Sequence, residues 1–496
     1  MPSRHDRIVE QRLQKLQHIR DLGIDPYPAR CHRTHTTSQA ARLLEDTPAG
    51  HSLDLEVSVV GRIVSMRKMG KSAFADIRDG SGKLQLLFQS IHQYDDVQKQ
   101  LFEDLDLGDF IGASGQPMRT RTGEPTVGVR TFTLLAKSLQ PLPEKWHGLS
   151  DVETRYRHRH LDLLANERTR QIFRTRSRII AAVRRFLDER GFIEVDTPVL
   201  LPHAGGALAR PFVTHHNTLD QDLYLRIATE LHLKRLIIGG FERVYEVGRI
   251  FRNEGISTKH NPEFTTLESY QAYADYHDVM RMLEEMVATV CQQVLGTCRV
   301  EYGGAVIDFT PPWPRLGLRE TILEHSGIDF VRYPDVLRLR ARMKELGMEV
   351  DPGKNWAHLV DHLLSTHVEP KLVQPTFLVD YPASLSPLAK SKPGQERVVE
   401  RFEAFAGGME IANAFTELND PLEQRQRFIQ QQRDRVAEGE EVEVVDEDFL
   451  EALEYGMPPC GGLGVGIDRL VMLLTNNQSI REVILFPHMK EKPESH

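Results

Sequence analysis

The sequence predicts an α+β protein in which a small region of short strands precedes a larger region of helices and strands. Residues 53–140 alternate apolar and polar residues in short runs separated by turn signals, which is typical of strands. Residues 172–187 then place apolar side chains at helical spacing, and strand-like segments with polar faces follow. With 496 residues, 40% of them hydrophobic and 27% charged, the chain is long enough for several globular domains.

Residues 1–52 are predicted to form a helical extension. Apolar residues recur at helical spacing over residues 7–22, and the Asp-Pro-Tyr-Pro run at 25–28 interrupts the pattern.

Residues 53–140 match a five-stranded barrel of the OB type, although other small barrels fit the pattern nearly as well. The predicted strands cover residues 55–64, 74–78, 83–89, 110–115 and 126–136, with a helix over 94–102. A linker over 141–160 follows and contains two prolines at its start, so that 161–496 form the second domain.

Bulk composition excludes several classes of protein. The four cysteines, Cys31, Cys291, Cys298 and Cys460, have no zinc-site spacing, so neither a structural zinc site nor a disulfide framework is expected. A net charge of −9 gives no hint of nucleic-acid binding, which must rest on local residues. No apolar run approaches the roughly 20 residues of a membrane span, and no secretory signal is visible, so we expect a cytoplasmic protein without membrane contact.

Residues 244–270 read as two strands joined by a polar loop. Alternation places Phe264, Thr266, Glu268 and Tyr270 on one face of the second strand, where they could form the floor of a site for a base and a cation. Arg252, at the end of the first strand, is placed to meet a phosphate. An ordinary hairpin with one polar face explains the alternation equally well, but not the full Phe-Arg-Asn-Glu-Gly…His-Asn-Pro-Glu-Phe string.

A glycine-rich run at 461–470 could let the backbone approach a nucleotide, with Arg469 reaching its terminal phosphate. Such a run is weak evidence alone. No acidic residue follows at the spacing of a dinucleotide-binding fold, which is therefore disfavoured.

Residues 401–420 supply carboxylates and a polar strand face. Asn413, Phe415 and Glu417 share one face, while Glu403 and Glu410 offer the hard oxygen ligands that Mg²⁺ prefers. Strict alternation points Glu410 away from Asn413, so a shared site requires a bend or bulge between them.

Together these strings resemble the three motifs of class II aminoacyl-tRNA synthetases, at 191–198, 251–254 and 462–469. The N-terminal barrel is similar to that of the subgroup with the lysyl, aspartyl and asparaginyl enzymes. Residues 205–212, 214–217, 228–231 and 413–420 resemble lysyl-tRNA synthetases in particular. The likeness covers residues 57–487. It implies a catalytic domain built on an antiparallel sheet flanked by helices, with a helical insertion around 319–375.

The resemblance also implies roles for individual residues. Arg252 and Arg469 would be catalytic. ATP would be held by Arg252, Glu254, His260, Asn261, Phe264, Glu403, Gly466 and Arg469. Lysine would be held by Gly206, Glu230, Arg252, Glu268, Tyr270, Asn413, Phe415 and Glu417. Glu403 and Glu410 would ligate Mg²⁺, of which several ions accompany ATP. In the barrel, the tRNA anticodon would be bound by Arg67, Phe74, Gln85 and Glu124.

The implied reaction joins lysine to AMP at the expense of ATP, releasing pyrophosphate, and then transfers lysine to the 3′-terminal adenosine of tRNA(Lys). The family also implies a homodimer. Lysine is supported independently, though weakly, because a desolvated ammonium needs carboxylates such as Glu268 and Glu417. No Arg or Lys lies on their two strand segments at a position facing the substrate, as an aspartate pocket would need.

Three alternatives remain at this stage. An aspartyl or asparaginyl enzyme shares the architecture, and a ligase that lysylates a protein shares the catalytic core but lacks the barrel. A catalytically inactive tRNA-binding paralogue is disfavoured by the intact arginines and glutamates. Two departures from the family pattern, Leu208 and His232, leave the details of the pocket open, and His232 is expected to be a half-buried helix residue.

Overall fold

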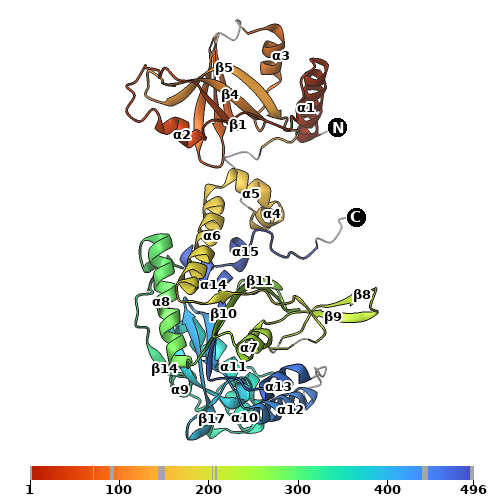
Figure 1. Cartoon of the computed structure of the whole chain (residues 1–496), viewed down its shortest axis with the longest axis vertical. Coiled ribbons are helices and arrows are strands. Elements are labelled where there is room, and N and C mark those ends of the chain that lie inside the picture. The colour runs from red at the N-terminus through yellow and green to blue at the C-terminus, as the bar shows by residue number, and fades with distance from the viewer. Residues whose placement is uncertain are drawn as a thin grey trace. The chain divides into compact units, whose positions relative to one another are not determined.

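The computed structural model describes residues 3–70, 72–89, 94–142, 151–203, 205–206, 209–437 and 445–491. The chain divides into two compact units, Met1–Gly148 and Leu149–His496 (Figure 1). Among the described residues, no helix is both long and apolar enough to cross a membrane.

A closed five-stranded barrel forms the body of the first unit, as predicted for an OB-type fold, with strand order β1-β2-β3-β5-β4. The strands are β1 (Val57–Met69), β2 (Ser72–Arg78), β3 (Lys83–Phe88), β4 (Phe110–Arg119) and β5 (Pro125–Ala136). β1 and β4 run several residues beyond their predicted ends because backbone pairing with β2 and β5 continues where side-chain alternation fades. Helix α3 (Asp96–Asp104) begins later than predicted because Asp95 caps it.

Two N-terminal helices, α1 (Arg4–Asp21) and α2 (Thr37–Arg42), belong to this unit. Ile19 and Ala40 are fully buried in the same apolar cluster as the barrel strands. α1 begins earlier than its apolar pattern indicates because Ser3 and Asp6 form a capping box. The N-terminal residues thus add to the barrel core.

A sheet with strand order β14-β15-β17-β18-β19-β11-β10-β6 forms the body of the second unit, and β16 pairs with β17. Its six inner strands run antiparallel to one another, as predicted. The edge strands β14 and β6 each pair in parallel with the inner strand beside them. The strands are β6 (Ile193–Glu194), β10 (Arg243–Phe251), β11 (Glu263–Ala272), β14 (Arg315–Gly317), β15 (Thr376–Pro382), β16 (Ser391–Lys392), β17 (Gln395–Ala406), β18 (Met409–Thr416) and β19 (Cys460–Gly466).

Helices α6 (Glu167–Asp188), α8 (Tyr276–Leu295) and α14 (Ile467–Leu474) share an apolar core with this sheet, and Ile480 and Val483 near the C-terminus also belong to it. α6 and α8 lie side by side (Figure 1). Strand residues that face this core, such as Leu267, Phe402 and Ala414, alternate with residues that line a cavity. The helices therefore cover one face of the sheet and leave the other face for the cavity.

The segment predicted as a helical insertion holds most of α9 (Leu318–Ser326), α10 (Val336–Glu345) and α11 (Trp356–Leu363). Its apolar side chains form a separate core with β15 and β17. The predicted linker lies partly outside the described residues, and its second half forms α4 (Val152–Arg157) and the start of α5 (Arg159–Ala165).

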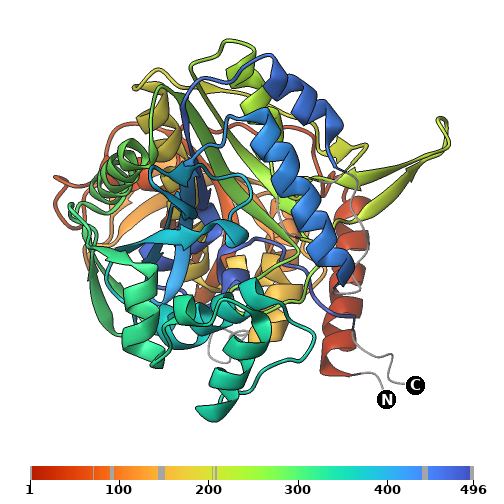
Figure 2. The ribbon, with the colours of Figure 1, turned by 90° about the horizontal axis from the view of Figure 1, so that it is seen from below.

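The remaining elements surround the sheet. A three-stranded sheet, β7 (Leu200–Leu201), β9 (Gln221–Leu225) and β8 (Val213–His216), ends in a hairpin that projects from the second unit (Figures 1 and 2). β12 (Arg299–Tyr302) and β13 (Ala305–Asp308) pair with each other. The other helices are α7 (Glu230–Ile238), α12 (Pro421–Ala437), α13 (Glu447–Glu454) and α15 (Ile480–Val483).

Candidate active site

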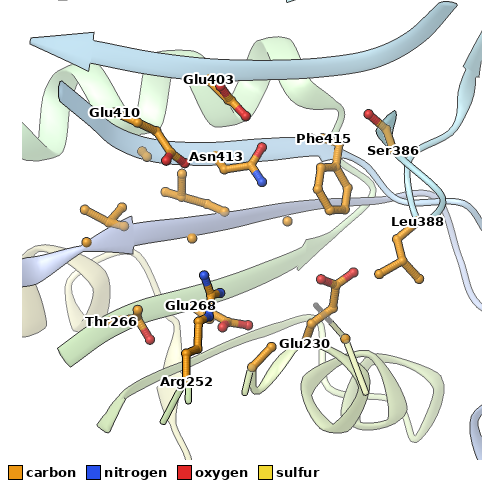
Figure 3. A pocket seen from close by; sticks show the side chains of 18 of the residues that line it. Glu230, Arg252, Thr266, Glu268, Ser386, Leu388, Glu403, Glu410, Asn413 and Phe415 are labelled. Atoms are coloured by element: carbon orange, nitrogen blue, oxygen red, sulfur yellow. The ribbon is translucent and has the colours of Figure 1, made fainter. Parts of the chain in front are cut away.

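A cavity of about 640 Å³ lies over the polar face of the second unit's sheet. Its floor comes from β11, β17, β18 and β19, and one wall comes from the start of α7. Figure 3 shows Glu403 and Glu410 at one end, Glu230 at the other, and Arg252 with Glu268 between them. The cavity therefore has two acidic ends and a cationic side chain near its middle.

Every predicted site residue of the second unit lines this one cavity. They are Gly206, Glu230, Arg252, Glu254, His260, Asn261, Phe264, Glu268, Tyr270, Glu403, Glu410, Asn413, Phe415, Glu417, Gly466 and Arg469. The structure thus brings together residues that are up to 263 positions apart in the sequence, from Gly206 to Arg469. Their individual roles remain predictions.

The hairpin of β10 and β11 supplies the middle of the cavity. Alternation along β11 turns Phe264, Thr266 and Glu268 toward the cavity, as predicted. The guanidinium of Arg252 lies 5.3 Å from the centre of the Phe264 ring. A flat aromatic face beside a fixed cation is suited to a base and its attached phosphate.

The bulge required by the sequence is present in β18. Ala404 pairs with Ala412, whereas Phe405 pairs with Glu410, so β18 gains one residue relative to β17. Both Ile411 and Ala412 are buried, which breaks the alternation. The extra residue turns Glu410 toward the same cavity as Asn413 (Figure 3).

Glu403 and Glu410 form the first acidic end. Glu403 pairs with Arg401 at 2.5 Å and accepts a hydrogen bond from the Tyr381 hydroxyl at 2.8 Å. Arg469 donates to the backbone oxygen of Glu410 at 2.8 Å and to its carboxylate at 3.1 Å. Burial, strengthened by Glu410 against the opposing effect of Arg401, raises the pKa of Glu403 to about 7.

The donor set at this end fits Mg²⁺ in part. The two carboxylates offer hard oxygens, and burial beside a like charge favours a cation between them. Within the described part of the chain, no group of three or more His, Cys, Asp or Glu side chains is placed to hold a metal ion. A cation here would therefore complete its coordination with phosphate oxygens and water.

Glu230, Glu268 and Glu417 form the second acidic end. Burial raises the pKa of Glu268 to about 7, and the Glu230 charge adds to the effect. Burial also raises the pKa of Glu417 well above its usual value, while Lys234 acts against this rise. Oε1 of Glu417 is buried and accepts no hydrogen bond from the described residues. This oxygen therefore lacks a donor, which a cationic ligand would supply.

Gly462 leaves room for this carboxylate. A Cβ atom on Gly462 would lie 1.9 Å from Oε1 of Glu417 and 2.6 Å from Cε1 of Tyr270. At Gly464 the nearest atoms would be 3.7 Å away or more, so only Gly462 of this pair is required for space. The glycine-rich strand β19 thus lets the acidic end form.

Comparisons with known proteins agree with this geometry. The model of class II tRNA synthetases of the D, K and N group matches residues 151–490, and that of OB-fold nucleic acid-binding domains matches residues 57–142. A lysine–tRNA ligase of Dehalococcoides mccartyi is 58% identical over 98% of this chain and 97% of its own length. The lysine–tRNA ligase of Moorella thermoacetica is 54% identical, and that of Chloroflexus aurantiacus is 52% identical, each over 98% of both chains.

The chain belongs to the lysine–tRNA ligase family of class II tRNA synthetases. It is an enzyme, and the inactive-paralogue alternative is set aside. The lysine–tRNA ligase names and the barrel also disfavour the aspartyl or asparaginyl alternative and the protein-lysylating alternative.

One argument made from the sequence against an aspartate pocket is wrong. Arg401 lies directly across the strand pair from Phe415, lines the cavity and donates to Oδ1 of Asn413 at 3.0 Å. Lys234, on α7, is fully buried and forms an ion pair with Glu417. Arg401 reaches the cavity from β17, and Lys234 reaches Glu417 from α7 without lining the cavity, which an inspection of the two strand segments alone does not reveal.

Other cavity residues were not predicted from the sequence. Asp361 enters from α11 in the helical insertion, and Lys259 pairs with Glu369 at 2.8 Å. The i,i+4 spacing of Glu230 and Lys234 was a visible signal for their ion pair. His232 is half-buried on α7, as expected, whereas Leu208 lies outside the described residues.

In the first unit, three of the predicted anticodon residues lie on adjoining strands, and Glu124 directly precedes β5. Arg67 pairs with Phe74 across β1 and β2, and Gln85 lies on the next strand, β3. The Thr126 hydroxyl contacts Gln85 and the backbone oxygen of Glu124, each at 3.0 Å. Phe74 is only half-buried and is not part of the barrel's apolar cluster, so its ring is accessible for stacking.

Proposed function

We propose that the cavity of this lysine–tRNA ligase family member activates lysine with ATP and then transfers the lysyl group to tRNA(Lys). The observation that carries the proposal is the buried, unsatisfied Oε1 of Glu417 at the acidic end formed by three glutamates. The ε-ammonium of lysine would donate to this oxygen, since a buried carboxylate is stabilised by a paired cation.

The rest of the lysine molecule fits the neighbouring side chains. Glu230 and the backbone of Gly206 would receive the α-amino group, while Arg252 would face the carboxylate. The methylene groups would lie between Tyr270 and Phe415, which line the same cavity. This orientation directs the lysine carboxylate toward the half of the cavity that carries His260 and Arg469.

ATP would occupy that half. Its adenine would stack on Phe264, opposite Arg469, and its phosphates would extend toward Glu403 and Glu410. Mg²⁺ bound by these carboxylates and the phosphates would neutralise charge on the leaving pyrophosphate. His260 contacts Arg469 at 3.3 Å, which helps to orient that guanidinium.

The first chemical step needs no general base because the lysine carboxylate is already a nucleophile. One carboxylate oxygen attacks the α-phosphorus in line, the bond to the pyrophosphate oxygen breaks, and lysyl-adenylate forms. Catalysis then consists of positioning together with charge stabilisation by Arg252 and Arg469. In the second step the 3′-hydroxyl of the terminal adenosine attacks the lysyl carbonyl and releases AMP.

The barrel would bind the anticodon by stacking a base on Phe74, with Arg67, Gln85 and Glu124 beside it.

A homodimer is supported by the edge of the second unit's sheet. Ile193 on the edge strand β6 is 48% exposed, and Leu200 nearby is also 48% exposed. The proposed substrates, tRNA, lysine and ATP, support a cytoplasmic location.

The proposal is tested by ATP–pyrophosphate exchange with purified full-length protein and Mg²⁺, offering each of the twenty amino acids separately. Exchange with lysine alone is the expected result. Exchange with a different amino acid would retain the fold and overturn the assignment of the acidic end. Absence of exchange with every amino acid would contradict the proposed activity.

A further inference from the structure

Among the residues that the structure describes, Lys234 is the one cation that contacts the second acidic end and has no place in the proposed reaction. Its side chain is fully buried on α7 and does not line the cavity. The ammonium lies 2.6 Å from Oε1 of Glu230 and forms a second ion pair with Oε2 of Glu417. A buried ammonium with two carboxylate partners is held in one position and stays charged.

The two oxygens of Glu417 have different surroundings. Oε2 faces Lys234, whereas Oε1 faces the space left open by Gly462, beside the Tyr270 ring. Gly462 and Tyr270 line the cavity and Lys234 does not, so Lys234 approaches Glu417 from behind the cavity wall. Glu417 thus pairs with Lys234 through Oε2 and leaves Oε1 facing the space proposed for the substrate.

The aromatic rings around Lys234 restrict it further. The ammonium lies 5.6 Å from the centre of the Phe415 ring and 5.9 Å from that of Phe449. Both distances are within the range of cation–π attraction. These contacts, with the two ion pairs, leave the ammonium little freedom to move into the cavity.

We propose that Lys234 is a positioning residue for amino-acid selection, which holds Glu417 ionised with Oε1 free to receive the ε-ammonium of lysine. The inference rests on the proposed role of Glu417. It follows from charge balance, because Glu230, Glu268 and Glu417 would otherwise repel one another in a buried space. With Lys234 in place, that repulsion is partly cancelled without filling the space for the substrate.

The pKa directions agree with this arrangement. Burial, reinforced by Glu230 and Glu268, raises the pKa of Glu417, and Lys234 is the group that lowers it. Burial would also lower the pKa of Lys234, but Glu230 and Glu417 outweigh burial, and its pKa is raised. Loss of the ammonium would therefore raise the pKa of Glu417 further and favour its protonated form, which distinguishes an ammonium from a methyl group less well.

The test compares lysine with norleucine, which has the same carbon chain without the ε-ammonium. In full-length Lys234→Gln, the KM for lysine and the Ki of norleucine are measured by ATP–pyrophosphate exchange. The preference for lysine over norleucine should fall roughly tenfold or more at pH 7.5 and recover as the pH is raised, since each unit of pKa changes the ionised fraction about tenfold. The KM for ATP should stay within about twofold of the unmodified protein. Lys234 contacts Glu230 and Glu417, which belong to the acidic end opposite Glu403.

Lys137→Gln is the matched control. The side chain of Lys137 is also fully buried and forms ion pairs, with Asp106 and Asp109 in the barrel unit. This variant should lose thermal stability but keep its preference for lysine over norleucine. An unchanged preference in folded Lys234→Gln would overturn the inference, as would a parallel rise in the lysine, norleucine and ATP constants.

Two further variants cover a failure of Lys234→Gln to fold and separate the inference from the proposed function. Glu417→Gln alone should weaken lysine binding, and an unchanged lysine KM there would reject the proposed pocket itself. Lys234→Gln with Glu417→Gln removes both charges of the pair, which restores charge balance. Its lysine KM should match that of Glu417→Gln within about twofold if Lys234 acts through Glu417. A further large loss in the double variant would overturn the inference.

Discussion

Gly462 and Glu417 lie so close across neighbouring strands that a Cβ atom on the glycine would fall 1.9 Å from the carboxylate oxygen Oε1. Gly462 therefore sets the position of a buried side chain, besides leaving backbone accessible to a ligand. The requirement is steric, since the clash involves a buried carboxylate and the buried Tyr270 ring.

Gly462→Ala should therefore raise the KM for lysine and lower thermal stability. The added methyl group displaces Glu417 or Tyr270, and overpacking of this kind costs about 1–3 kcal/mol. Exchange kinetics and the Tm would measure the two effects. Gly464→Ala is the stability control, because its Cβ would meet nothing nearer than 3.7 Å. Equal losses of Tm in both variants would show that any side chain added to β19 is destabilising, which would contradict the steric argument.

Arg252→Ala should nearly abolish adenylate formation. The guanidinium lies beside Phe264 in the middle of the cavity, where charge develops on the α-phosphate. Removal of such a donor typically costs roughly 100-fold to 1,000-fold in kcat. ATP–pyrophosphate exchange with lysine gives the rate. Arg249→Ala is the matched control, since Arg249 lies on the same strand, is exposed and forms only a 3.6 Å pair with Glu263. Near-normal exchange in Arg252→Ala would refute its catalytic role.

Phe74→Ala should raise the KM for tRNA while leaving exchange without tRNA unchanged. Stacking of a single-stranded base on an aromatic ring contributes about 1–3 kcal/mol, which corresponds to a five-fold to 150-fold change in affinity. Aminoacylation at varied tRNA concentration measures the change. Leu107→Ala, at another exposed apolar residue of the same unit, should leave the KM for tRNA unchanged. A loss of adenylation in Phe74→Ala would contradict the proposal that the first unit binds the anticodon while the second forms the adenylate.

The barrel strands were predicted from a local pattern, whereas the antiparallel sheet and most cavity residues were predicted from the family resemblance. Alternation in β11 places Phe264, Thr266 and Glu268 correctly, since a strand's period is fixed by its backbone. It also required a bulge near Glu410, which β18 contains. The side chains that the sequence did not predict lie on other elements. Lys234 lies on α7, Arg401 on β17 and Asp361 on α11. Such neighbours depend on strand order and helix placement, which a single segment does not encode.

Ionisation of Glu268 should make the stability of the protein depend on pH. Burial and the Glu230 charge raise its pKa to about 7 in the folded protein, above the value of about 4.3 for an exposed glutamate. Between these two values the folded state holds a proton that the unfolded state has released. Stability from this group is therefore present at low pH and falls as the pH rises toward 7.

Glu268→Gln imitates the protonated form and should remove this dependence. Relative to the unmodified protein, its Tm should be nearly unchanged at about pH 4 and higher at about pH 8, where the native carboxylate is charged and buried. Glu246→Gln provides the contrast, because Glu246 lies directly across the strand pair and forms a 2.5 Å ion pair with Arg226. Loss of that pair leaves a buried guanidinium without its partner, so the Tm should fall throughout this pH range. A Glu268→Gln protein that is less stable near pH 8 would mean that the charged carboxylate contributes favourably to the fold, and the assigned direction of its pKa shift would be wrong.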